Sequence, residues 1–313
     1  MALIETPFAS RNDRDEIQAW IYTPATTPRA VVHLIHGLGE HSRRYIHLIN
    51  AFLDAGFIVA ATDHAGHGRT AALSGVWQDA GDNGDIVVRD DELQLAEVVS
   101  QRFPGLPYVV FGHSWGSIIA RDVASARPDP LAGLALCGVA AQIPSCDDPD
   151  MLAAVNKAIA EHGDQSIAPD DLVNRLFGSF FERIPNPQAA NEWVACDPGV
   201  CQDHATDPFN NFGAPMTLRF FKAFLESYLR TNDPSWITPL HKDLPVLILS
   251  GSEDPVSHYG EGALHVANDL HHAGLHDVRS LIIAGMRHEV HNEPESRAFV
   301  EQELVTFVEH CIG

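Results

Sequence analysis

The chain has little positive charge, and this shortage narrows what it can bind. Lysine and arginine together number 20 against 42 aspartates and glutamates, so the formal net charge is −22. Lysine occurs only at Lys157, Lys222 and Lys242, which leaves no basic patch to serve as an anchor. Nucleic acids and anionic membranes repel such a chain, so we expect neither as a primary partner.

The sequence also has no long apolar run and no regular cysteine spacing, and its first residues do not predict a signal peptide. No stretch approaches the roughly 18 apolar residues of a membrane-spanning helix. The first residues, Met-Ala-Leu-Ile-Glu-Thr-Pro, lack the charged and apolar regions typical of a signal peptide. The five cysteines are odd in number and scattered, at positions 137, 146, 196, 201 and 311. We therefore expect a reduced, cytoplasmic protein without disulfide bonds.

Apolar runs typical of buried strands alternate with helical patterns along most of the 313 residues. The expected strands lie at 3–8, 16–23, 30–35, 57–63, 108–111, 131–137, 245–250 and 278–284. The expected helices lie at about 45–55, 86–103, 118–124, 260–273 and 294–310. This alternation predicts an α/β fold with a mostly parallel central sheet and helices on both faces.

The alternation stops in the middle of the chain. Residues 141–228 contain helical patterns near 150–161, 169–182 and 215–230, but no strong strand. Because open α/β sheets hold their sites at the carboxyl ends of the strands, a strand-poor segment is most simply placed over those ends. We expect a core made of residues 1–140 and 229–313, with residues 141–228 inserted as a helical cap.

A Gly-x-Ser-x-Gly motif at residues 112–116 follows the apolar strand at 108–111 and precedes a helical pattern. Strand, tight turn and helix together form the context of a nucleophile elbow. A serine on so sharp a turn has a strained backbone, and glycines two residues away prevent steric clashes with the neighbouring strand and helix. We therefore predict that Ser114 is a nucleophile.

A serine hydroxyl needs a base, and the base needs an acid to orient it. In this type of fold the acid and then the histidine follow the serine, each on a loop after a strand. Asp254 directly follows the strand at 245–250, whereas Asp243 precedes it and Glu253 should face elsewhere. His288 follows the strand at 278–284 and is favoured over His291 by its position in the loop.

Acyl transfer also needs hydrogen-bond donors for the oxyanion of the tetrahedral intermediate. One expected donor is the backbone N–H of Trp115, the residue after the nucleophile. The other is the N–H of Leu38, on the glycine-bearing loop after the strand at 30–35. Both donors are main-chain groups, so the identity of their side chains does not disqualify them.

Three sequence blocks resemble the monoacylglycerol lipase and lysophospholipase branch of the α/β-hydrolases. They are His-Gly-Leu-Gly-Glu-His-Ser-Arg-Arg-Tyr at 36–45, Asp-His-Ala-Gly-His-Gly at 63–68, and Gly-His-Ser-Trp-Gly-Ser at 112–117. The surroundings of Asp254 and His288 extend the likeness over nearly the whole chain, most weakly at 141–205. The resemblance implies a serine hydrolase that acts on a small lipid ester through an acyl-enzyme on Ser114, with no cofactor and no metal.

The resemblance also implies that Glu40, Arg44 and His291 line the site. Trp115 stands where the family more usually has methionine, and Ser117 where glycine is common. Trp115 is expected to narrow the pocket, which leaves the preferred acyl group open. Head group, acyl length and oligomeric state are not determined by the sequence.

Aromatic residues gather in the expected cap. Eight of the fifteen phenylalanines fall there, at positions 177, 180, 181, 209, 212, 220, 221 and 224. Large apolar side chains over a serine site suit an acyl chain, and Phe177 and Phe181 are our candidates for substrate contact. Equally, these side chains can form the core of the cap itself. Contact with a membrane surface would be transient at most, and through the cap.

Three other interpretations compete with a lipid ester hydrolase. A thioesterase or short-chain carboxylesterase would use the same residues, and a non-catalytic binding protein could share the fold. A metal hydrolase is suggested by histidines 33, 36, 41, 64 and 67, but these have no metal-ligand spacing such as His-Glu-x-x-His. Cys196, Cys201 and His204 likewise lack a second close pair of ligands. The sequence therefore favours the serine mechanism over the metal one.

Overall fold

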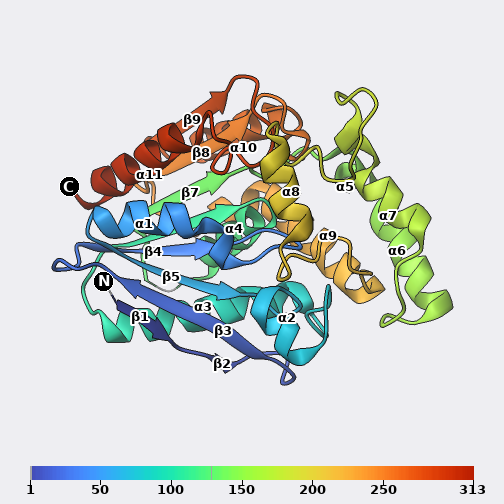
Figure 1. Cartoon of the computed structure of the whole chain (residues 1–313), viewed down its shortest axis with the longest axis horizontal. Coiled ribbons are helices and arrows are strands. Elements are labelled where there is room, and N and C mark those ends of the chain that lie inside the picture. Colours follow the sequence, from blue (N-terminus) through green and yellow to red (C-terminus); the bar gives the residue numbers. More distant parts are fainter. Residues whose placement is uncertain (1, 128) are drawn as a thin grey trace.

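Parallel strands form the centre of the molecule in the computed structural model, which describes residues 2–127 and 129–313 (Figure 1). Within these residues a nine-stranded sheet has the order β1-β3-β5-β4-β6-β7-β8-β9, with β2 paired to β3. The pairs from β5 to β9 are parallel, and β1, β2 and β3 are antiparallel to their neighbours. The strands are β1 Ala2–Glu5, β2 Phe8–Ala9, β3 Glu16–Thr23, β4 Ala30–Ile35, β5 Phe57–Asp63, β6 Tyr108–His113, β7 Gly133–Cys137, β8 Val246–Gly251 and β9 Val278–Ile283.

Helices follow most of the strands, as the alternating pattern predicts. The α-helices are α1 Ile46–Asp54, α2 Gly68–Ser74, α3 Gly84–Arg102, α4 Trp115–Ala126, α5 Pro144–Asp147, α6 Pro149–His162, α7 Asp170–Phe177, α8 Pro198–Thr206, α9 Leu218–Asn232, α10 Glu261–His272 and α11 Arg297–Ile312. Short 3₁₀ turns are η1 Ser42–Tyr45, η2 Gly178–Phe181, η3 Pro234–Ile237 and η4 Pro255–Ser257. None of the described helices combines the length and the apolar composition that crossing a bilayer requires.

Some elements differ from the sequence prediction. The strand expected at 3–8 is divided into β1 and β2, because Pro7 has no N–H to donate to the ladder. The helix expected at 169–182 is α7 followed by the tighter turn η2. Helices α2, α5 and α8 were not predicted, because each is short and begins at a glycine or proline that also marks turns.

The two faces of the sheet contribute to separate apolar cores. Along β4, Val32 and Leu34 pack with α1 and α11, which lie side by side in Figure 1. Val31 and Ile35 point to the opposite face and join the core of α3, α4, α10 and the helices of residues 141–228. Successive side chains of a strand point to opposite faces, so a strand covered on both sides carries apolar residues on both faces.

The chain between β7 and β8 forms helices α5 to α9, which lie to one side of the sheet (Figure 1). Helix α9 continues to Asn232 and packs against α3 and α4 of the core. The boundary that we expected at residue 228 therefore falls inside a helix. We propose that residues 141–228 act as a cap and that α9 joins this cap to the core.

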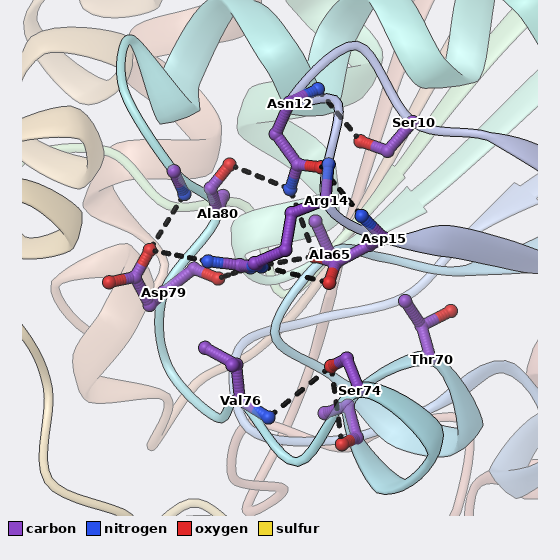
Figure 2. A network of polar contacts seen from close by, with 12 residues as sticks. Ser10, Asn12, Arg14, Asp15, Ala65, Thr70, Ser74, Val76, Asp79 and Ala80 are labelled. Atoms are coloured by element: carbon purple, nitrogen blue, oxygen red, sulfur yellow. Dashed lines mark hydrogen bonds and ion pairs between the residues drawn. The ribbon is translucent and has the colours of Figure 1, made fainter.

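Polar contacts attach the β2–β3 hairpin to the loop before α3 (Figure 2). Asn12 Nδ2 donates to the carbonyl of Ala80 at 3.1 Å, and Arg14 donates to the carbonyl of Asp79 at 2.7 Å. Arg219 of α9 donates to the Asp79 carboxylate at 2.9 Å. Asp79 thus links the hairpin, the loop and the cap, and this end of α9 has a defined position.

Candidate functional site

Ser114 lies on the sharp turn between β6 and α4. Its backbone has φ 57° and ψ −124°, a conformation that L-residues rarely adopt. A Cβ at Gly112 would lie 2.2 Å from the carbonyl oxygen of Gly116, and one at Gly116 would lie 2.2 Å from that of Ile35. Only glycine fits at either position, so the steric reason for the motif is present in the structure.

Asp254 and His288 meet at the carboxyl ends of β8 and β9. His288 Nδ1 lies 2.9 Å from Asp254 Oδ1, and both side chains are buried. Glu253 faces outward, where its carboxylate lies 3.7 Å from Arg183. His291 is buried elsewhere, with its ring stacked on Tyr45 at 4.8 Å. The structure therefore joins the expected acid to the expected histidine and leaves both competitors apart.

The ring of His288 lines the same cavity as Ser114. The N–H of Ser114 donates to the carbonyl of Cys137 at 3.0 Å. Gly138 follows Cys137, and a Cβ on Gly138 would lie 2.9 Å from His288 Cε1. The His288 ring therefore packs against the end of β7, the strand whose Cys137 carbonyl accepts the hydrogen bond from Ser114. Among the described residues, no hydrogen bond is made by His288 Nε2. This nitrogen is free to accept a proton.

Nearby carboxylates change the basicity of His288. Burial alone lowers the pKa of this imidazole, but the carboxylates of Asp254, Glu289 and Glu40 together more than offset the effect, with Asp254 contributing most. The pKa of His288 consequently lies above its ordinary value of 6.5. A base whose charged form is stabilised in this way suits proton transfer near neutral pH.

The loop after β4 and the start of α4 each bring one main-chain N–H group close to Ser114. A Cβ at Gly37 would lie 3.0 Å from Ser114 Cβ, which shows how closely the loop approaches. Glu40 Oε1 accepts from the Gly37 N–H at 2.6 Å and so fixes the loop. Within residues 2–127 and 129–313 the N–H of Leu38 has no acceptor, and the N–H of Trp115 lies in the first turn of α4. Both groups can donate to a ligand.

Buried charges support this loop. Arg44 donates to Glu40 at 3.0 Å and to Glu289 at 2.5 Å and 2.9 Å. Burial raises the pKa of Glu289, but the Arg44 guanidinium more than offsets it and holds that pKa below its ordinary value. Tyr45 donates to Glu40 at 2.6 Å, and its oxygen lies 2.8 Å from His113 Nδ1. Two carboxylates and one guanidinium leave one excess negative charge behind the loop.

An apolar cavity of about 40 Å³ opens at Ser114. Its wall consists of Leu38, Glu40, His113, Ser114, Trp115, Ala140, Ile143, Phe177, Phe180, Trp193, Val194, His204, Phe212, Phe224, Val256, His288 and Glu289. Of the substrate contacts expected from sequence, Glu40 and Phe177 belong to this wall. Arg44, His291 and Phe181 do not: Arg44 and His291 lie behind the wall, and the neighbouring Phe180 takes the place expected of Phe181.

A segment of the cap rests directly on the loop after β4. The N–H of Asn211 donates to the carbonyl of Gly39 at 3.0 Å, and His41 Nε2 lies 2.9 Å from Asp207 Oδ2. A Cβ at Gly39, whose φ is +70°, would lie 2.5 Å from Phe212 Cα. Glycine is required here both for the backbone conformation and for the close approach.

The histidines clustered near Ser114 are bound by other residues of the protein. His33 Nε2 lies 2.6 Å from Glu92, and His64 Nδ1 lies 2.9 Å from the same carboxylate. His36 stacks on His64 at 3.8 Å and accepts from its backbone N–H at 3.1 Å. The described residues contain no group of three or more His, Cys, Asp or Glu side chains placed to hold a metal ion. These rings therefore have structural partners beneath the loop.

Several residues of the cavity wall were not singled out as part of the site from sequence, among them His113, Trp193 and His204. His113 lies inside the serine motif, but its side chain could equally have faced away. Trp193 and His204 belong to the segment 141–205, where the resemblance to the family is weakest. Trp193 lies 5.3 Å from the ring of His288, between ring centres. Aromatic content was the only signal for Trp193, and it does not distinguish a pocket wall from a core.

The chain matches the family described as serine aminopeptidase, S33, over residues 26–295. It is 28% identical to the monoacylglycerol lipase of Mycolicibacterium smegmatis over 290 residues, 93% of this chain and 92% of that protein. Among solved structures, a lipase in its open form has 49% sequence identity and a TM-score of 0.96 over the whole of both chains. A thermostable carboxyl esterase from Bacillus coagulans, solved with glycerol, has 40% identity and a TM-score of 0.95, again over both whole chains. The chain therefore belongs to the serine aminopeptidase S33 family and has the α/β-hydrolase fold of these lipases and esterases.

Proposed function

We propose that this protein is a serine hydrolase that cleaves carboxylic esters of single-chain lipids, monoacylglycerol or lysophospholipid, through an acyl-enzyme on Ser114. One observation carries the proposal. Ser114 and His288 line the same cavity as Leu38 and Trp115, and the far edge of His288 is hydrogen-bonded to the buried Asp254 at 2.9 Å. This is the combination of nucleophile, base, orienting acid and oxyanion donors that acyl transfer requires.

In this mechanism Ser114 Oγ attacks the ester carbonyl carbon while His288 Nε2 accepts the hydroxyl proton. Asp254 keeps the proton of the ring on Nδ1 and stabilises the imidazolium. The N–H groups of Leu38 and Trp115 stabilise the oxyanion. His288 then gives its proton to the alcohol oxygen as the carbon–oxygen bond breaks. Water, which gives a proton to the same nitrogen, then attacks the acyl carbon; the bond to Ser114 Oγ breaks, the serine oxygen takes that proton back from His288, and the fatty acid is released.

The cavity wall supports a lipid rather than a polar acyl group. Phe177, Phe180 and Phe212 line the cavity together with Trp193 and Phe224. Aromatic side chains of this kind can bury an alkyl chain, which favours binding by roughly 0.8 kcal/mol per methylene. The likeness to monoacylglycerol lipases supports the same substrate class.

A labelled fluorophosphonate tests the chemistry. We expect covalent capture of the wild-type protein and none of the Ser114→Ala variant, since Ser114 is the proposed nucleophile. A folded wild-type protein that is not captured would support a binding role instead. Turnover of monoacylglycerol, lysophospholipid and short-chain esters, compared at several acyl lengths, then tests the substrate class, and a strong preference for acetyl or butyryl esters would contradict it.

A short-chain carboxylesterase is the second candidate, favoured by the size of the cavity. About 40 Å³ accommodates only a small part of a long acyl chain unless the cap moves. Trp115 contributes to the narrow wall, and its ring packs at 5.5 Å on Phe220 of α9. The likeness to the carboxyl esterase of Bacillus coagulans agrees with this alternative. The comparison of acyl lengths distinguishes the two candidates.

A further inference from the structure

His204 of α8 lines the cavity with one edge of its ring held in place. Asn191 Nδ2 donates to the carbonyl of Cys201 at 2.6 Å and lies 3.3 Å from His204 Nδ1. The carbonyl only accepts, so it orients the amide with its NH₂ group toward the ring. Nδ1 of His204 is therefore the acceptor, and the ring proton is on Nε2.

The Nε2–H group of His204 has no acceptor among the described residues. The side chain is buried, with 7% of its surface exposed, and the hydrogen bond at Nδ1 is the one the ring makes. Burial lowers the pKa of His204, so the ring is a neutral donor rather than a cation. The His204 ring is held at Nδ1 by Asn191, and its Nε2–H group has no protein acceptor in the part of the chain that the structure describes. Because this ring belongs to the cavity wall, the Nε2–H group can donate a hydrogen bond to a ligand.

The neighbours of His204 indicate what kind of ligand group fits. Glu40 and Glu289 line the same cavity, and Arg44 balances one of their two charges. A hydroxyl group both donates and accepts, so it can accept from His204 and donate to a carboxylate. A phosphate only accepts, and the excess negative charge repels it. This polar part of the wall adjoins His288, the group that would protonate the departing alcohol.

We propose that His204 is a specificity-determining residue that donates a hydrogen bond from Nε2 to a free hydroxyl on the alcohol part of the ester. The inference rests on the proposed function, because the alcohol is placed by the role given to His288. It adds to that function a direct hydrogen bond from the cap to the alcohol part of the substrate. The donor belongs to residues 141–205, the segment that resembles the family least. The favoured alcohol is an uncharged polyol.

Two esters with the same acyl chain test the proposal: monolauroylglycerol, and propyl laurate, whose alcohol has the same carbon skeleton without free hydroxyls. We expect His204→Phe to lower kcat/KM for monolauroylglycerol by about three- to tenfold, the range for one hydrogen bond, and to leave propyl laurate unchanged. His204→Gln retains an N–H donor and should recover part of the loss. His162→Phe, at an exposed histidine of the cap, is the control and should change neither ester.

An equal loss on both esters, or no loss on either, would overturn the role of His204. A wild-type protein that does not prefer monolauroylglycerol to propyl laurate would overturn it as well. In those cases hydrolysis of either ester that disappears with Ser114→Ala leaves the proposed function standing. If the wild-type protein hydrolyses neither ester, both proposals fail together.

Discussion

Replacing Asp254 by asparagine would remove a charge and leave the hydrogen bond to His288 in place. Asp254 Oδ1 faces His288 Nδ1 and also accepts from the Val256 N–H at 2.9 Å. Oδ2 faces the hydroxyl of Ser250 at 3.4 Å, which can accept from an amide. An asparagine would therefore keep its oxygen at the Oδ1 position and place its NH₂ group toward Ser250. The tautomer of His288 would not change.

The size of the effect follows from the lost charge. Opposite charges roughly 4 Å apart attract by about 4 kcal/mol at an effective dielectric constant of about 20. Asp254 supplies this attraction only when His288 is protonated, as in the transition state. Since about 1.4 kcal/mol corresponds to a factor of ten, we expect Asp254→Asn to lower kcat by about a thousandfold.

The pH profile gives a second readout with a definite sign. His288 must be neutral to act as base, so kcat/KM falls as the pH drops below its pKa, which lies above 6.5 in the wild-type protein. Without the Asp254 charge this pKa falls, and the acid limb of the profile moves to lower pH. Asp243→Asn, at an exposed carboxylate before β8, is the control and should leave the limb in place. A folded Asp254→Asn variant with near-normal kcat or an unmoved acid limb would refute the mechanism.

Further predictions concern the pocket, the stability and the turn. Trp115→Met should shift the preferred acyl length upward in a series of p-nitrophenyl esters, because it removes part of the narrow wall; an unchanged preference would locate the limit elsewhere. Burial raises the pKa of Asp91 to about 7, so its contribution to stability is lost as the pH rises from about 4 to about 7. Asp91→Asn should therefore gain up to about 3 kcal/mol in unfolding free energy over the wild type between pH 5 and pH 8 in urea titrations, and a constant difference would contradict this. Gly116→Ala should prevent folding or abolish activity, because its Cβ would overlap backbone atoms. Gly178→Ala, whose Cβ would lie in open space, is the control and should raise the free energy of unfolding by about 0.5–1 kcal/mol. A well-folded, active Gly116→Ala protein would be inconsistent with the packing.

The positions of the strands were predictable because they depend on local pattern. Apolar runs bounded by turns identified the parallel strands, and parallel strands place their carboxyl ends at one edge of a sheet. The sequence alone therefore placed Ser114, Asp254 and His288 on loops at a common edge, and their roles are still proposals. Short helices such as α2 and α8 were not predicted, because about two turns carry too little periodicity to distinguish a helix from a loop.

Tertiary structure decided which side chains face the cavity. Phe180 and Phe181 are adjacent in sequence, and no periodicity in so short a segment shows which ring turns inward. Arg44 belongs to the block at 36–45 and His291 lies three residues after His288, yet neither side chain belongs to the cavity wall. His204 could be recognised as a candidate ligand contact only from the structure, which places Asn191 and the cavity next to its ring. The position of a strand depends on the pattern within one segment, whereas a pocket wall depends on contacts between segments far apart in the chain, which only the folded structure brings together.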